Sequence, residues 1–262
     1  MTGVRIAWER HGEGAPLLLI HGLGYARWGW DPVLPGLAER FDVLLFDNRG
    51  IGESDAPPGP YTVEQLAGDA VQVLDEAGVE RAHVVGTSLG GMVAQEVALS
   101  APDRVQRLVL ACTTPGGPDA HPMPQGTVAL IALAATLEPH VALRRYVENA
   151  LAPATPTARP ELVEEILSHR LAAPQDPVAW VAQASAGATF DRFDRLGEIA
   201  APTLVQTGTE DGVVDPRNSE LLAEHLSDAR LERFAGAGHL FFWEQPDEFV
   251  ASVTRFLADS GT

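Results

Sequence analysis

Short apolar runs recur along the chain, each bounded by glycine, proline or charged residues. They are apolar almost throughout, which is typical of strands covered on both faces. Amphipathic helical patterns separate several of them, which predicts an α/β fold with a mostly parallel sheet flanked by helices. The predicted strands are Arg5–Arg10, Pro16–Ile20, Phe41–Phe46, Ala82–Gly86, Val105–Ala111, Pro202–Thr207 and Ala229–Phe234, and the predicted helices are Thr62–Ala77, Gly91–Ser100 and Asn218–Leu226.

One region interrupts this alternation. Residues 114–200 contain no convincing strand, and prolines separate their alanine-rich helical patterns. An ordinary crossover with extra helices would need fewer residues. We therefore expect a helical cap at 114–200, inserted into a core domain formed by 1–113 and 201–262. Its predicted helices are Gly126–Leu137, Val141–Leu151, Pro160–Ala172 and Pro177–Ala188.

Composition narrows the functional classes. The formal charge of −18 on 262 residues argues against nucleic acid and anionic membranes as partners, because both require clustered Lys and Arg. Cys112 is the single cysteine, so an intramolecular disulfide is excluded and a reducing compartment fits. The first residues carry charges where a signal peptide needs an apolar core, and no apolar run approaches the ~20 residues of a membrane span. We expect a soluble cytoplasmic protein that acts on a small molecule; the sequence carries no signal for its oligomeric state.

The segment VVGTSLGGMVAQ places one serine between a predicted strand and a predicted helix. A sharp strand-to-helix turn exposes the side chain at its corner and leaves little room two residues before and after it. Gly86 and Gly90 occupy those positions around Ser88. The turn also sets Ser88 at a helix N-terminus, which favours developing negative charge. We interpret Ser88 as a nucleophile, and not as a surface serine in a glycine turn.

A serine nucleophile needs a base that is oriented in turn by a carboxylate, in the chain order Ser, acid, His on this architecture. Asp211 follows the strand PTLVQTG, and His239 lies in a glycine-rich loop after the last strand. Ligands bind at the carboxyl edge of such sheets, so we predict a Ser88–His239–Asp211 triad. Glu210 and Asp215 compete with Asp211 for the role of the acid.

The loop His21-Gly22-Leu23-Gly24 follows the strand that ends at Ile20. Its glycines let backbone N–H groups approach a substrate, so the N–H groups of Leu23 and Leu89 are the candidate oxyanion-hole donors. We expect His21 to hold this loop through hydrogen bonds.

Together these segments resemble the α/β-hydrolase superfamily over essentially the whole chain. The matching stretches are HGLG at 21–24, DNRGIGESDAP at 47–57, GTSLGG at 86–91, GTEDGVVDP at 208–216 and GAGHLFFWEQP at 236–246. The resemblance implies the same roles for Ser88, Asp211, His239, Leu23 and Leu89, and a structural role for Asp47, Arg49 and Gly50. The stretches around residues 59–86 and 101–111 look most like 3-oxoadipate enol-lactonases and related small esterases. Enol-lactonases often carry Asn-Ser-Leu-Gly where this chain has His21-Gly22-Leu23-Gly24, the commoner esterase form.

The resemblance implies a serine hydrolase of a carboxylic ester or lactone that works through an acyl-enzyme. We expect no cofactor or metal, because the sequence shows no metal-ligand spacing, phosphate-binding glycine loop or dinucleotide fingerprint. Alternatives with the same triad are a carbon–carbon bond hydrolase, a perhydrolase-type haloperoxidase and an acyltransferase. A non-catalytic ligand receptor on the same fold is the alternative of another class. Candidate walls of the substrate pocket, each of which could equally be core packing, are Trp28, Trp30, Met92, Tyr146, Trp180, Phe241 and Phe242.

Overall fold

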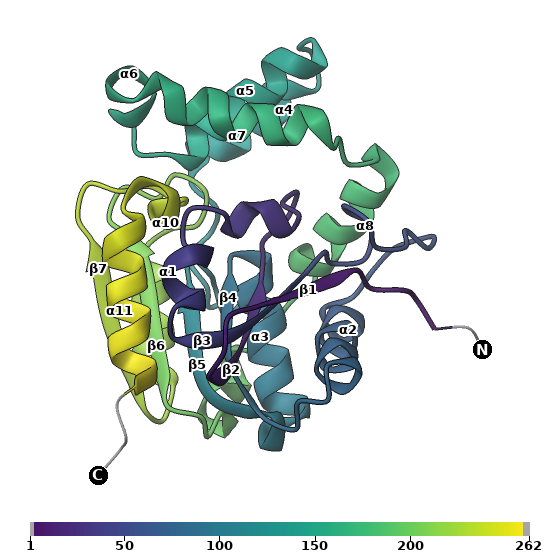
Figure 1. The fold of residues 1–262 in the computed structure, drawn as a ribbon. Helices are drawn as coiled ribbons and strands as arrows, with labels where there is room; N and C mark the ends of the chain where they lie inside the picture. Colours follow the sequence, from purple (N-terminus) through teal and green to yellow (C-terminus); the bar gives the residue numbers. More distant parts are fainter. Residues whose placement is uncertain (1–2, 259–262) are drawn as a thin grey trace.

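A computed structural model describes residues 3–258 and contains a seven-stranded sheet in the order β1-β3-β2-β4-β5-β6-β7. β1 is antiparallel to β3, and every other neighbouring pair is parallel. The predicted α/β fold with a mostly parallel sheet is therefore confirmed (Figure 1). The strands are β1 (Trp8–His11), β2 (Ala15–Ile20), β3 (Phe41–Phe46), β4 (Ala82–Thr87), β5 (Val105–Ala111), β6 (Thr203–Gly208) and β7 (Ala229–Phe234).

Helices cover both faces of the sheet, as the continuous apolar runs predict. Leu18 and Ile20 of β2 belong to one buried cluster, and Leu17 and Leu19 belong to the other. Each fully buried leucine contributes about 1.5–3 kcal/mol relative to an exposed one. The first cluster includes residues of α2 (Val63–Glu76), α3 (Leu89–Ser100) and α9 (Arg217–His225), and the second includes residues of α1 (Leu34–Ala38) and α11 (Pro246–Ala258).

The prediction for the first strand is wrong in its bounds, because β1 begins at Trp8 and not at Arg5. The backbone before Trp8 binds a loop instead of another strand. Asp55 donates its N–H to the carbonyl of Arg5 at 2.9 Å, and Ala7 donates its N–H to Ser54 Oγ at 2.9 Å. A strand requires backbone hydrogen bonds to a neighbouring strand, and β1 pairs with β3 only over Trp8–His11.

Several helices were not predicted. α11 is the longest of them. Its apolar stripe, which includes Phe249 and Val253, belongs to the buried cluster that contains Leu17 and Leu19 of β2. No helix formed by residues 3–258 is long and apolar enough to cross a membrane. The other unpredicted elements are short: η1 (Arg27–Trp30), α1, η2 (Pro102–Arg104), α6 (Thr155–Ala158), η3 (Phe193–Glu198) and α10 (Phe241–Glu244).

Between β5 and β6 the chain forms a run of helices, which we call the helical insertion. Figure 1 shows α4 to α7 above the end of the core that carries α10, with α8 descending toward α2. Hydrogen bonds tie α8 to the core: Tyr61 donates its N–H to the carbonyl of Ala182, and Ser185 Oγ donates to the carbonyl of Tyr61. The helices are α4 (Gln125–Ala134), α5 (Pro139–Ala150), α6, α7 (Pro160–Ala172) and α8 (Pro177–Ala188).

Candidate active site

Ser88 occupies a strained turn between β4 and α3, with φ 54° and ψ −121°. Hydrogen bonds through its backbone hold this conformation. Its N–H donates to the carbonyl of Ala111 at 2.9 Å, and its carbonyl accepts the hydroxyl of Thr113 at 2.7 Å. A non-glycine residue at positive φ costs of order 1–3 kcal/mol and persists only where the surroundings fix it. The turn leaves the Ser88 side chain partly exposed at the carboxyl edge of the sheet.

Gly90 has no room for a side chain. A Cβ there would lie 2.1 Å from the carbonyl oxygen of Ile20, a backbone atom in a buried strand. We expect Gly90→Ala to destabilise the protein by about 1–3 kcal/mol or more, because the clash forces backbone shifts. Gly68→Ala is the matched control, since open space surrounds that position in α2; there we expect stabilisation by about 0.5–1 kcal/mol. Urea unfolding measures both, and equal midpoints would contradict the steric argument.

Asp211 and His239 are in direct contact although they follow different strands. His239 Nδ1 lies 2.7 Å from Asp211 Oδ2, and both side chains are buried. The other oxygen, Oδ1, accepts the N–H groups of Val213 at 2.7 Å and Val214 at 2.9 Å. An ionised carboxylate only accepts hydrogen bonds, so it selects the tautomer with the proton on Nδ1. The second ring nitrogen, Nε2, is then free to accept a proton.

The two competing acids lie elsewhere. Glu210 is exposed, and its backbone N–H donates to the carbonyl of Ala237. Asp215 Oδ2 accepts a hydrogen bond from Arg217 at 2.5 Å, and this bond holds the pKa of Asp215 below its usual value. Of the three acids considered, the one in contact with His239 is Asp211.

The loop 21–24 lies directly against Ser88. A Cβ on Gly22 would be 2.9 Å from the Cβ of Ser88. Leu89 is the first residue of α3, so its N–H has no intrahelical partner. Leu23 is partly exposed in the same loop. The N–H of Leu89 thus directly follows Ser88 in the chain, and the N–H of Leu23 belongs to the loop that packs against Ser88.

His21, the first residue of this loop, is buried. Its Nδ1 accepts the N–H of Gly22 at 2.7 Å, and its ring stacks on Tyr25 with centroids 4.8 Å apart. Burial lowers the pKa of His21 to about 3, despite hydrogen bonds with the backbone. His21 is thus neutral in the folded protein, and it holds the loop as an acceptor.

A second buried histidine, His83 in β4, gives stability a predictable dependence on pH. Burial, with smaller contributions from the charges of Arg107 and Arg81, lowers its pKa to about 4. Below the ordinary value of about 6.5 the unfolded chain binds a proton that the folded chain excludes, so stability falls as the pH falls toward 4. Between pH 7.5 and 5 we expect the wild type to lose about 1–2 kcal/mol of unfolding free energy relative to His83→Leu, after allowance for solvent screening.

Urea unfolding at several pH values measures this difference. His140→Leu is the control, because His140 is exposed. If the two variants changed the pH slope equally, His83 would not be the source.

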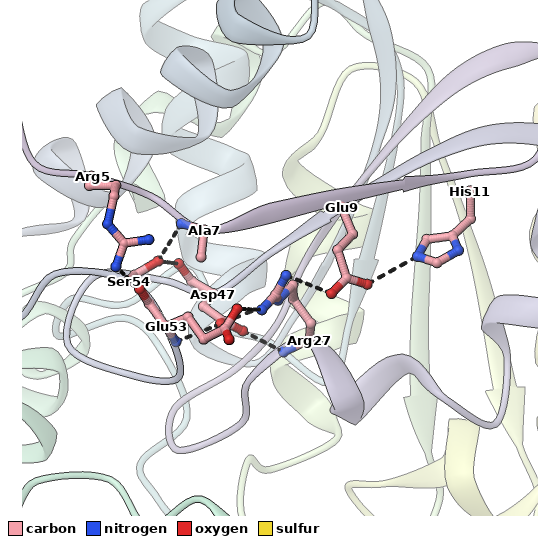
Figure 2. A network of polar contacts seen from close by, with 8 residues as sticks. All are labelled: Arg5, Ala7, Glu9, His11, Arg27, Asp47, Glu53 and Ser54. Carbon is pink, nitrogen blue, oxygen red and sulfur yellow. Dashed lines mark hydrogen bonds and ion pairs between the residues drawn. The ribbon is translucent and has the colours of Figure 1, made fainter.

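The Asp47 carboxylate binds the backbone of two segments, one of which directly follows the loop 21–24. Its carboxylate accepts the N–H of Arg27 at 2.7 Å and the N–H of Glu53 at 2.9 Å. Figure 2 shows the Arg27 guanidinium among Glu9, Glu53 and Asp47, and the distance to Glu9 is 2.6 Å. These contacts fix the chain that leaves the loop.

The remaining members of the 47–57 motif also make structural contacts. Arg49 forms paired hydrogen bonds with Asp69, each 2.6 Å long. Gly50 adopts φ +84° and donates its N–H to the carbonyl of Asp55. The contacts of Arg49 and Gly50 therefore join this loop to α2 and close the loop on itself.

The predicted pocket residues fall into two groups. Trp30, Phe241 and Phe242 are fully buried. Phe242 packs against both Trp30 and Phe241, and Trp30 and Phe242 also contact the His21 ring. Trp28 is partly exposed, but its ring is stacked under that of His169 of α7 at 4.8 Å. The partly exposed side chains that stay available as walls are Met92, Tyr146 and Trp180.

The helical insertion supplies contacts that the sequence analysis missed. Arg170 of α7 lies against the loop 21–24: a Cβ on Gly24 would be 2.8 Å from its Nη2, and its guanidinium lies 5.0 Å from the ring centroid of Tyr25. Thr127 of α4 donates to the carbonyl of Gly212, next to the acid. The available signal was weak, because Arg170 and Thr127 are single polar residues in otherwise ordinary helical patterns.

Comparison with known proteins places this chain in a family. Residues 15–246 match the family described as alpha/beta hydrolase fold. The chain belongs to this family. The resemblance inferred from the sequence motifs, to α/β-hydrolases that include small esterases, is thus confirmed. In the part of this α/β-hydrolase that the structure describes, no group of three or more His, Cys, Asp or Glu side chains is arranged to hold a metal ion.

Three similar proteins are named for different reactions. A protein of Azorhizobium caulinodans named as a candidate carbamate hydrolase, RutD, is 32% identical over 96% of this chain and 94% of its own. The 2-hydroxy-6-oxo-6-phenylhexa-2,4-dienoate hydrolase of Comamonas testosteroni is 31% identical over 96% and 91%. The crystal structure of the enol-lactonase from Burkholderia xenovorans has a TM-score of 0.87 at 27% identity and covers 98% of each chain. The family and these relatives together indicate that the chain is a hydrolase.

Proposed function

We propose that this hydrolase cleaves a carboxylic ester or a lactone through an acyl-enzyme on Ser88. The observation that carries the proposal is the 2.7 Å contact between His239 Nδ1 and Asp211 Oδ2, which leaves Nε2 as an acceptor. Ser88, Asp211 and His239 follow β4, β6 and β7, so all three lie at the carboxyl edge of the sheet. A serine hydroxyl needs such a base to become a nucleophile at neutral pH.

The reaction proceeds in two halves. His239 Nε2 takes the Ser88 hydroxyl proton while Oγ attacks the substrate carbonyl, and the N–H groups of Leu23 and Leu89 stabilise the oxyanion. The carbon–oxygen bond to the leaving group breaks, and the imidazolium returns the proton to the alcohol. Water then attacks the acyl ester, with His239 again as the base, and releases the acid and the free serine. A lactone follows the same steps, but its alcohol stays attached to the acyl group.

We further propose that residues 114–200 act as a cap that roofs the substrate pocket. Support comes from the contacts of the helical insertion with loops beside the site. Gln183 Nε2 donates to the carbonyl of Arg49 at 2.6 Å, and a Cβ on Gly187 would lie 3.4 Å from Leu89 and 3.6 Å from Met92. Met92, Tyr146 and Trp180 are the side chains that we assign to the pocket walls.

A fluorophosphonate tests the nucleophile, and p-nitrophenyl esters test the reaction. We expect one adduct per chain, mapped to Ser88, and turnover of acetyl, hexanoyl or aryl esters or of simple lactones. The relative rates across this panel report the shape of the pocket. An adduct on another residue, or labelling of Ser88 with no ester or lactone turned over, would contradict the proposal.

Carbon–carbon bond hydrolysis is the second candidate reaction. The Comamonas testosteroni relative is named as the hydrolase of a dienoate, the class of substrate that we expect for such an enzyme. The triad is shared, so the two reactions differ in the substrate that the pocket accepts. Coloured dienoates lose their absorbance on cleavage. Faster decay of such a dienoate than of any ester in the panel would favour this alternative.

A further inference from the structure

Glu244, the last residue of α10, joins two segments that are far apart in the sequence. Its Oε2 accepts the N–H of Gly238 at 2.6 Å. Its Oε1 accepts the N–H of Ala152 at 3.0 Å and the hydroxyl of Thr155. The carboxylate thus bridges the loop that carries His239 and the turn that connects α5 to α6.

The two segments are in close contact at this bridge. A Cβ on Gly238 would lie 2.5 Å from the backbone nitrogen of Ala152. On the other side of His239, the N–H of Leu240 donates to the carbonyl of Ala150 at 2.9 Å. The residues before and after His239 are therefore both held against the end of α5.

We propose that Glu244 is a positioning residue for His239, through which the helical insertion sets the place of the general base; the proposal rests on the proposed function. The Gly238 peptide directly precedes His239, so its displacement moves the imidazole relative to Ser88. A misplacement of about 1 Å costs about 100-fold in rate. The helical insertion then acts on the proton transfer as well as on substrate access.

The chemistry of the bridge requires a carboxylate. Both oxygens of Glu244 accept hydrogen bonds, and donors face both of them. Glutamine has the same shape but only one acceptor oxygen, so its amide N–H₂ would face either the N–H of Gly238 or the donors of the helical insertion. One side of the bridge must therefore open in Glu244→Gln.

We expect Glu244→Gln to lower kcat by about 10- to 100-fold with little change in KM, because a displaced base slows the chemical step and leaves substrate binding intact. The downfield proton NMR signal of the Nδ1–H that binds Asp211 should shift or broaden. Thr155→Val removes one donor on the side of the helical insertion and should give a smaller loss of kcat in the same direction. Glu210→Gln is the control, because it removes the same charge next to Asp211 from an exposed side chain.

The outcomes separate the two proposals. If a fluorophosphonate fails to label Ser88 in the wild type, the proposed function fails, and this inference fails with it. If the wild type is labelled and Glu244→Gln keeps its kcat and its NMR signal, the positioning role alone is overturned. A lower kcat with an unchanged signal overturns it too, because the base would still be in place. Should Glu244→Gln fail to fold, Thr155→Val decides: an unchanged kcat or an unchanged signal overturns the proposal, and a reduced kcat with a changed signal in a folded variant supports it.

Discussion

Ser88→Ala should fold normally and lose at least about 10⁴-fold in kcat/KM toward any ester that the wild type hydrolyses, as removal of the nucleophile from such triads does. The fold should survive because the hydrogen bonds that hold the turn run through the backbone of Ser88, including the bond from its N–H to Ala111. Alanine also keeps the Cβ that lies near Gly22. The measurements are steady-state kinetics with p-nitrophenyl acetate and the midpoint of urea unfolding.

Ser100→Ala is the matched control, because it makes the same change at the far end of α3. Ser100 Oγ donates to the carbonyl of Glu96 within that helix, far from the turn at Ser88. We expect its activity to be near that of the wild type. Activity of Ser88→Ala within 10-fold of the wild type, or a fluorophosphonate adduct on that variant, would place the nucleophile elsewhere.

The features that the sequence predicted well are those governed by local sterics or by continuous burial. The turn at Ser88 needs glycine two residues before and after it, and a Cβ on Gly86 would indeed lie 2.3 Å from the carbonyl oxygen of Gly90. β3 has the predicted bounds because all of its residues are buried, and in β5 the run from Leu108 to Ala111 is likewise buried. In such places the residue pattern alone restricts the backbone to one conformation.

Features that depend on distant partners were harder to predict. Trp30 and Phe242 lie close in the sequence to the loop 21–24 and to His239, but both are fully buried core residues. An apolar pocket wall and an apolar core select the same side chains, so the sequence could not separate them. Glu244 was missed for a related reason: its donors Ala152 and Thr155 are about ninety residues away, and only the folded chain brings them together.

Asp211→Asn should retain the fold and lower kcat/KM by about 10⁴-fold, the size of the effect that the same change has on kcat in a protease with a Ser-His-Asp triad. Asparagine keeps an acceptor for the N–H groups of Val213 and Val214, which bind Oδ1 of the aspartate. Its Nδ2 would then face His239 Nδ1 in place of Oδ2, and a donor at that position favours the tautomer with the proton on Nε2. The imidazole would then present a donor to Ser88 and could not take its proton.

Two variants serve as controls for Asp211→Asn, and they also test the other acids of this segment. Glu210→Gln removes an exposed carboxylate, and Asp215→Asn removes one that is paired with Arg217. Both should keep activity near the wild-type level, because neither carboxylate contacts His239. Fluorophosphonate labelling should slow in parallel with ester hydrolysis only in Asp211→Asn, since both reactions need the same base. If Asp215→Asn gave the larger loss with its fold intact, the carboxylate that orients the base would be Asp215, and the contact between Asp211 and His239 would be structural.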